Sequence, residues 1–168
     1  MRFATLAEAG IDARIAAMAN RRVPLAGLLV FAAAAAHAQW VPSGPLASVL
    51  VVRDCNDTGG DVAVARLDPP TVYVCPRVVE LIRKTDPGAE HFYFVHEFGH
   101  IALATSDEAA ADCWAARELA AAPHGERYLR AMIEHLRRRP DVDSRRYGSP
   151  RQRAERIRTC AEEAGSRR

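Results

Sequence analysis

Three features that this 168-residue chain lacks exclude some classes of function: a long apolar run, a CxxC pair and an excess of positive charge in residues 39–168. No long apolar run follows residue 38, and the earlier run from Val23 to Ala35 is too short to span a bilayer comfortably. The four cysteines form no CxxC pair, so the sequence does not indicate a structural metal site built on cysteine. Of the 23 basic and 21 acidic residues, 19 of each lie in residues 39–168, so charge does not point to nucleic acid as a partner.

The first 38 residues have the pattern of a secretory signal peptide. Arg21-Arg22 precede the apolar run, and Ala36-His37-Ala38 is a small-x-small cleavage site. The basic stretch that follows Met18 fits the start of such a signal better than residues 1–17, so we expect translation to begin at Met18. Cleavage after Ala38 would leave residues 39–168 as one periplasmic or secreted domain with no stable membrane span.

All four cysteines lie in the part that we expect to be exported. An even number of cysteines in an exported chain indicates disulfides, and four cysteines allow three pairings. We favour a bond between Cys55 and Cys75, which would close the strand region, and a bond between Cys113 and Cys160, which would tie two helices together.

The pattern along residues 39–168 predicts a small α+β domain. Short alternating apolar segments bounded by turn residues predict strands, and longer apolar periodicities predict helices, so a short sheet comes before the helical part. The expected strands cover residues 48–53, 62–67 and 71–75, and the expected helices cover 76–84, 91–103, 107–122, a segment that opens at 124, and 149–164.

The most informative motif is HExxH, from His96 to His100, within a run that reads as a buried helix. Residues i and i+4 lie on the same face of an α-helix, so the two imidazoles can bind one Zn²⁺ while Glu97 acts as a general base. Asp86-Pro87 would supply the N-cap and first-turn proline of this helix. The motif therefore predicts the apparatus of a zinc peptidase.

A catalytic zinc site needs a third protein ligand. The metzincin extension HExxHxxGxxH is absent, because Leu103 and Ser106 stand where its glycine and third histidine would be. An alanine-rich stretch instead offers Glu108 and Asp112, one helical turn apart, with Thr105 or Ser106 as its N-cap. One acid can ligate zinc while the other accepts the outer N–H of a ligand histidine. Only seven residues separate His100 from Glu108, which leaves open which acid is the zinc ligand, and we favour Glu108.

HExxH followed on a later helix by ExxxD resembles the gluzincin metallopeptidases, the thermolysin-like clan. The run EAAADCWAA that starts at Glu108 is similar to a run in bacterial neutral zinc metallopeptidases, and the matching part covers only about residues 96–116. The resemblance implies a zincin-like domain with an HExxH helix, a ligand helix and two further helices. It also implies His96, His100 and Glu108 as zinc ligands, Glu97 as general base and Asp112 as the partner behind a ligand histidine.

We therefore expect an exported zinc-dependent endopeptidase that hydrolyses peptides or unfolded proteins with a metal-activated water. An edge strand of the small sheet would align an extended substrate by β-augmentation, as zincins commonly do. The alternative is a catalytically inactive zincin-like binding or assembly protein of the cell envelope, which keeps the zinc helices without an open substrate cleft.

The region from Arg137 onward carries 11 arginines against five acids. A nucleic-acid groove would need interleaved aromatic residues, and Tyr147 alone does not provide them. We interpret the arginines as a solvated helix face, with contact between one arginine and a substrate carboxylate or oxyanion as the alternative. The segment Ser149-Pro150 with Arg153 also resembles an element that follows the zinc site in several gluzincin-type peptidases.

Overall fold

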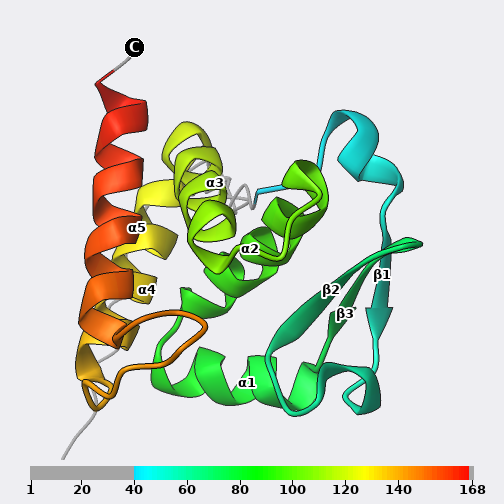
Figure 1. Cartoon of the computed structure of the whole chain (residues 1–168), viewed down its shortest axis with the longest axis horizontal. Helices are drawn as coiled ribbons and strands as arrows, with labels where there is room; N and C mark the ends of the chain where they lie inside the picture. Colours follow the sequence, from blue (N-terminus) through cyan, green and yellow to red (C-terminus); the bar gives the residue numbers. More distant parts are fainter. Residues whose placement is uncertain (1–39, 167–168) are drawn as a thin grey trace, which may run out of the picture. The chain divides into compact units, whose positions relative to one another are not determined.

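The computed structural model describes residues 40–166 as a small sheet and a set of helices (Figure 1). This confirms the α+β class and the strand-before-helix order. The signal-peptide prediction for residues 1–38 lies outside the described residues. No helix within residues 40–166 is long and apolar enough to cross a membrane. The elements are η1 (Gly44–Ser48), β1 (Leu50–Arg53), η2 (Asn56–Thr58), β2 (Ala63–Leu67), β3 (Pro70–Val74), α1 (Pro76–Thr85), α2 (Ala89–Leu103), α3 (Glu108–Ala121), α4 (Gly125–Arg138) and α5 (Pro150–Gly165).

Strand β2 forms the edge of the sheet that faces α2. The strand order is β1-β3-β2, with β3 parallel to β1 and antiparallel to β2. The backbone N–H of Ala65 points away from β3 and donates to the Glu97 carboxylate at 2.7 Å. Because hydrogen-bonding groups alternate along an antiparallel strand, the backbone groups of Ala63 and Leu67 face the same way. This edge can accept a further strand.

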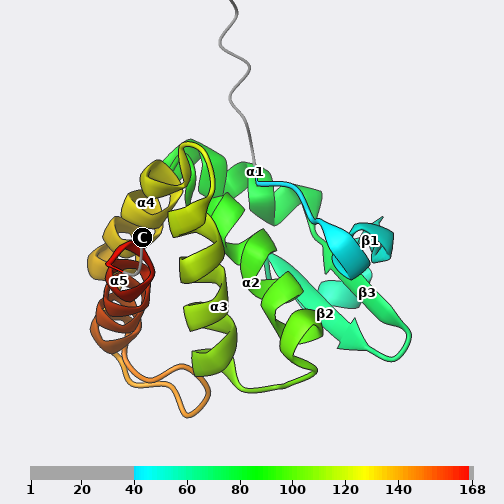
Figure 2. The ribbon, with the colours of Figure 1, turned by 90° about the horizontal axis from the view of Figure 1, so that it is seen from above.

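Helix α2 lies between β2 and α3 (Figure 2). Gly99 permits the close approach of α2 to α3, because a Cβ atom at this position would lie 3.0 Å from the carbonyl oxygen of Ala111 and 3.1 Å from Trp114 Cε3. Any larger residue at position 99 would press against the backbone of α3. The glycine inside the HExxH motif thus lets the first turn of α3 lie beside the two motif histidines.

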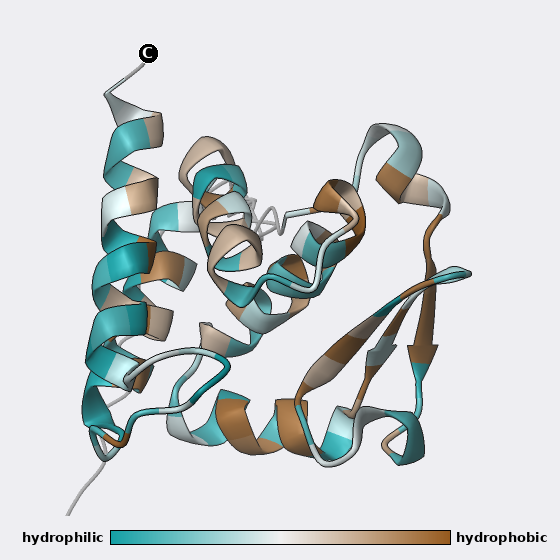
Figure 3. Ribbon diagram, viewed as in Figure 1, coloured by the Kyte–Doolittle hydropathy of each residue, from teal (hydrophilic) through white to brown (hydrophobic). Residues whose placement is uncertain are grey.

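The core lies mainly among α2, α3, α4 and α5. Phe92, Leu119, Met132 and Ile157, one from each helix, are fully buried there. Figure 3 shows apolar residues along the strands and hydrophilic residues along much of α5, as expected for a helix with only one buried face.

Two disulfides brace this arrangement, with the pairing that the sequence favoured. Cys55–Cys75 joins η2 to the residue before α1, and Cys113–Cys160 joins α3 to α5. The second bond fixes the helix that carries Glu108 and Asp112 against the C-terminal helix.

The predicted cap of the HExxH helix is wrong. Helix α2 begins at Ala89, behind Gly88 in a left-handed conformation (φ 102°), with no side-chain cap. Asp86 instead ends α1, and its carboxylate contacts His135 and Arg138 on α4. A positively charged partner on another helix outcompetes the local backbone for this carboxylate.

The predicted cap of the ligand helix is also wrong, by one or two residues. Asp107 caps α3, because its Oδ1 atom accepts the N–H groups of Ala109 and Ala110 at 2.8 and 3.2 Å. Thr105 serves the preceding turn instead, where its hydroxyl accepts the N–H of Asp107 at 3.0 Å. A carboxylate is also the better cap, since it interacts favourably with the helix dipole.

Candidate metal centre

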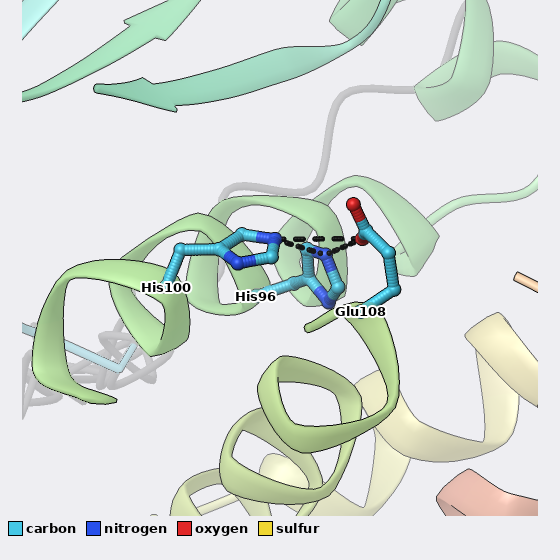
Figure 4. Close-up of side chains that lie close together, drawn as sticks. All are labelled: His96, His100 and Glu108. Atoms are coloured by element: carbon cyan, nitrogen blue, oxygen red, sulfur yellow. Dashed lines mark hydrogen bonds and ion pairs between the residues drawn. The ribbon is translucent and has the colours of Figure 1, made fainter. Parts of the chain in front are cut away.

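Three buried side chains converge between α2 and α3 (Figure 4). His96 and His100 project from one face of α2, and Glu108 projects from the first turn of α3. The His96 Nε2 atom lies 2.9 Å from Glu108 Oε2 and 3.1 Å from His100 Nε2, and His100 Nε2 lies 3.4 Å from Glu108 Oε2. Ligand atoms around a tetrahedral zinc ion lie about 3.3 Å apart. The three side chains could therefore hold one metal ion.

The outer nitrogens of both imidazoles fix which ring atom is free to bind a metal. His100 Nδ1 lies 2.8 Å from the carbonyl oxygen of Thr105, which can only accept, so Nδ1 carries the hydrogen. His96 Nδ1 lies 2.9 Å from Asp112 Oδ1, and the same argument holds because an ionised carboxylate only accepts. In the neutral imidazoles, which are the form that binds a metal, both Nε2 atoms therefore turn lone pairs toward the Glu108 carboxylate. Three converging acceptors repel one another unless a cation lies between them, and this donor set fits a divalent metal.

Asp112 lies behind His96 with no exposed surface. Its Oδ1 atom lies 2.9 Å from His96 Nδ1, within ion-pair distance. Arg153 donates to the carboxylate from Nε at 3.0 Å and Nη2 at 2.8 Å, and Arg156 donates at 2.9 Å. Burial would raise the pKa of Asp112, but His96 and Arg153 hold the pKa well below its usual range. Asp112 thus stays ionised and orients the imidazole.

The residues around the site also change the pKa values of His96 and Glu108. Burial lowers the pKa of His96, but its contacts with Asp112 and Glu108 outweigh burial and raise the pKa overall. Burial likewise opposes ionisation of Glu108, yet the two histidines hold its pKa well below the usual range. The second oxygen of Glu108 accepts a hydrogen bond from Arg146, which lies in the loop between α4 and α5.

Glu97 lies next to the three converging side chains and is 8 % exposed. Burial raises its pKa, while the charges of His96 and His100 and the N–H of Ala65 act in the opposite direction. A buried carboxyl with a raised pKa is suited to accept and release protons. One of its oxygens is held by Ala65 of β2, so the carboxyl group has a fixed position between the sheet edge and α2.

Two clefts meet at this carboxyl group. The larger has a volume of about 800 Å³ and extends toward α1 and the end of α4, and the smaller, of about 90 Å³, extends toward the turn between α2 and α3. Both are bordered by Asp61, Ala63, Glu97 and Tyr147. An extended chain lying across the junction would therefore pass directly over Glu97.

Tyr147 closes the junction from the side of the loop. Two guanidiniums lie near its ring, with the carbon of Arg153 at 4.4 Å from the ring centre and that of Arg146 at 5.4 Å. Burial, together with the charge of Glu108, raises the pKa of Tyr147 to about 12. The phenol therefore keeps its proton at neutral pH and can donate a hydrogen bond into the junction.

The structure brings together all five residues that the sequence singled out, with Asp112 behind His96 as the arrangement of an ExxxD helix requires. It adds partners that the sequence did not assign: the N–H of Ala65, Arg146, Tyr147, Arg153 and Arg156. The interpretation of the arginines as a solvated face is wrong for Arg153, which is 6 % exposed. Two features of the sequence could have indicated these arginine partners: the excess of arginine from residue 137 onward and the segment Ser149-Pro150 with Arg153.

No protein-family model, curated protein or solved structure matches this chain significantly.

Proposed function

We propose that this protein is an exported zinc-dependent endopeptidase with a gluzincin-like metal centre. The observation that carries the proposal is the convergence of three metal-binding lone pairs beside the buried carboxyl group of Glu97, at the junction of two clefts. Two histidines and one glutamate are a donor set of catalytic zinc sites, which leaves one position for water or substrate. A structural zinc site would instead be closed by four protein ligands.

The residues have complementary roles in peptide hydrolysis. His96, His100 and Glu108 would hold Zn²⁺, which when bound supplies a polarised substrate carbonyl and an acidified water. Glu97 accepts the proton of the attacking water and passes it to the leaving amine. Tyr147 donates a hydrogen bond to the substrate oxygen that gains negative charge.

The edge of β2 supplies the alignment of the substrate. An extended peptide that pairs with the backbone groups of Ala63 and Leu67 that face away from β3 would lie along both clefts, with a peptide bond at Glu97. Main-chain pairing is insensitive to side-chain identity, which suits a substrate that is an unfolded protein or a flexible peptide.

Export is supported by two features of different kinds. Residues 21–38 have the order of a signal peptide, and the structure contains two disulfides, which form and persist in oxidising compartments. Export to the periplasm or the medium predicts a mature N-terminus at Gln39, which N-terminal sequencing of the recovered protein can establish.

A catalytically inactive metal-binding protein is the second candidate, and two contacts favour it. The N–H of Ala65, a group that would pair with a substrate strand, donates to Glu97 instead, and Arg146 covers the outer oxygen of Glu108. Both contacts must be displaced or shared when a substrate enters. An inactive protein would bind zinc and peptides without cleaving them.

Metal analysis combined with point variants separates these candidates. The purified protein is expected to bind one zinc ion per chain and to degrade a reduced, unfolded protein. His96→Ala and His100→Ala should lose zinc, whereas Glu97→Gln should retain zinc and lose hydrolysis. His124→Asn is a matched control, because it removes an exposed imidazole at a left-handed position that asparagine tolerates. Zinc binding without hydrolysis in the wild type would favour the inactive protein, and failure to bind zinc would exclude both candidates.

A further inference from the structure

The larger cleft runs beyond the metal centre to a polar recess at the end of α4. Tyr93 precedes Glu97 by four residues, about 6 Å along α2, and both border the cleft together with Arg139. The recess therefore lies in the same cleft as the carboxyl group of Glu97. The apolar part of the wall of this cleft includes Val62, Val78, Ile82 and Leu136.

A chain of hydrogen bonds fixes the Tyr93 hydroxyl in this recess. His135 Nδ1 lies 2.7 Å from Asp86 Oδ2 and carries the hydrogen, because a carboxylate only accepts. Burial lowers the pKa of His135, with Arg139 and Arg153 acting in the same direction, which favours the neutral imidazole. In that form Nε2 is the acceptor. The Tyr93 hydroxyl lies 3.2 Å from this Nε2 and donates to it. The oxygen of Tyr93 thus keeps its lone pairs for a neighbouring donor.

Arg139 provides a positive charge that no protein carboxylate neutralises. Its neighbour Arg138 pairs with Asp86, and Arg153 pairs with Asp112, but within residues 40–166 no carboxylate lies within ion-pair distance of Arg139. Its guanidinium lies close enough to Tyr93 and His135 to act on the pKa of both.

The acidic residues of the cleft lie elsewhere. Asp61 and Glu97 border both clefts and so lie near their junction, whereas Arg139 borders only the larger cleft. The junction and the recess therefore differ in charge. An anionic group would be attracted at the recess, where no carboxylate of residues 40–166 pairs with Arg139.

The direction of β2 decides which part of a substrate reaches the recess. Val62, just before the strand, borders only the larger cleft, and Leu67, at its end, borders only the smaller one. A peptide that pairs antiparallel to β2 runs the opposite way, from the smaller cleft to the larger. Residues that follow the cleaved bond would then enter the larger cleft.

We infer that Arg139, oriented by Tyr93, selects a carboxylate on the substrate residue that follows the cleaved bond. This inference rests on the proposed endopeptidase function. A glutamate side chain fits the order of the cleft, since its methylene groups would lie against the apolar walls and its carboxylate would reach the guanidinium. The terminal carboxylate of a short product-like peptide is the second source of the same group.

Matched peptides test the inference by cleavage. Three amidated peptides with Glu, Gln or Leu after the cleaved bond are compared, and a fourth carries Leu with a free C-terminus. The Glu peptide should exceed the Gln peptide about 10- to 100-fold in kcat/KM, the range of a charge-assisted hydrogen bond. Arg139→Gln should bring this ratio close to one, and Arg137→Gln, an exposed charge-matched control outside both clefts, should preserve it. Preference for the free C-terminus over its amide would identify the terminal carboxylate as the source.

Binding to a non-cleaving protein keeps the inference separate from catalysis. With zinc-loaded Glu97→Gln, calorimetry should show tighter binding of the Glu peptide than of the Gln peptide, and adding Arg139→Gln should abolish the difference. The protein could hydrolyse unfolded protein but cleave and bind the Glu and Gln peptides equally. That result would contradict selection of a carboxylate by Arg139 and would still support the endopeptidase function. If the wild-type protein binds the Glu peptide selectively but cleaves no substrate, selection of a carboxylate by Arg139 is supported and the endopeptidase function is contradicted.

Discussion

Asp112 and Arg153 form a buried two-pronged ion pair at the back of the metal centre, although 41 residues separate them in the chain. The pair joins α3 to α5, and the Oδ1 atom of Asp112 contacts both His96 Nδ1 at 2.9 Å and Arg153 Nη2 at 2.8 Å. It keeps the carboxylate ionised, and an ionised carboxylate is what fixes the tautomer of a ligand imidazole. Helix α5 thus acts on the metal centre indirectly: Arg153 contacts Asp112, and Asp112 contacts the ligand His96.

Replacing Arg153 should therefore affect both stability and metal binding. Arg153→Met leaves Asp112 buried with Arg156 as its remaining arginine, and loss of one partner of a buried ion pair costs about 3 to 5 kcal/mol of unfolding free energy. Urea unfolding of the metal-free protein measures this loss. Zinc affinity should fall about 10- to 100-fold, as it does when the partner of a ligand histidine is disturbed. Arg151→Met, at an exposed position of the same helix, should change neither quantity appreciably. Unchanged zinc affinity in Arg153→Met would show that Asp112 does not orient His96.

The two acids of α3 should respond differently to substitution. Glu108→Ala removes an atom that lies against both Nε2 atoms and should abolish stoichiometric zinc binding. Asp112→Asn acts from behind His96 and should weaken zinc binding about 10- to 100-fold. Zinc titrations on the folded fraction of each variant compare the two. The reverse order of effects would make Asp112 the ligand and move the centre by one helical turn.

The sequence contained enough information for the local part of this centre. Helical spacing places His96 above His100, and a four-residue spacing relates Glu108 to Asp112, so each pair is determined by one element. The strands and α-helices are likewise set by local periodicity, and their positions were predicted within a few residues, whereas the 3-10 helices η1 and η2 were not predicted.

The remaining parts depend on contacts between distant segments. Arg153 reaches Asp112, and Arg146 reaches Glu108, only after α5 and the preceding loop pack against α3. Arginine at these positions looks the same in the sequence as arginine on a solvated face. The cap at Asp86 failed for the same reason, because His135 and Arg138 become its partners only in the folded chain.

The pH dependence of hydrolysis should report the environment of Glu97. Burial raises its pKa above the ordinary value of 4.5, and the base must be ionised, so activity should fall as pH drops through an inflection above 4.5. Ala65→Pro removes the N–H that stabilises the carboxylate and should move the inflection to higher pH, while Ala65→Gly keeps the N–H and should not. Zinc content is measured at each pH, because protonation of the histidines also releases metal. An inflection that coincides with loss of zinc in all three proteins would contradict the assignment to Glu97.

The two disulfides should differ in their effect on the metal centre although both stabilise the fold. Replacing Cys113 and Cys160 together by alanine should cost about 2 to 4 kcal/mol of unfolding free energy, because the bond closes a long loop. It should also weaken zinc binding, since α3 carries Glu108 and loses its covalent tie to α5. The double replacement of Cys55 and Cys75 removes a bond between η2 and the start of α1, so it should lower stability while zinc affinity is retained in the folded fraction. Denaturant unfolding and zinc titration of both double variants test this difference. Equal zinc affinity in the two would mean that the packing between α3 and α5 positions Glu108 without the disulfide.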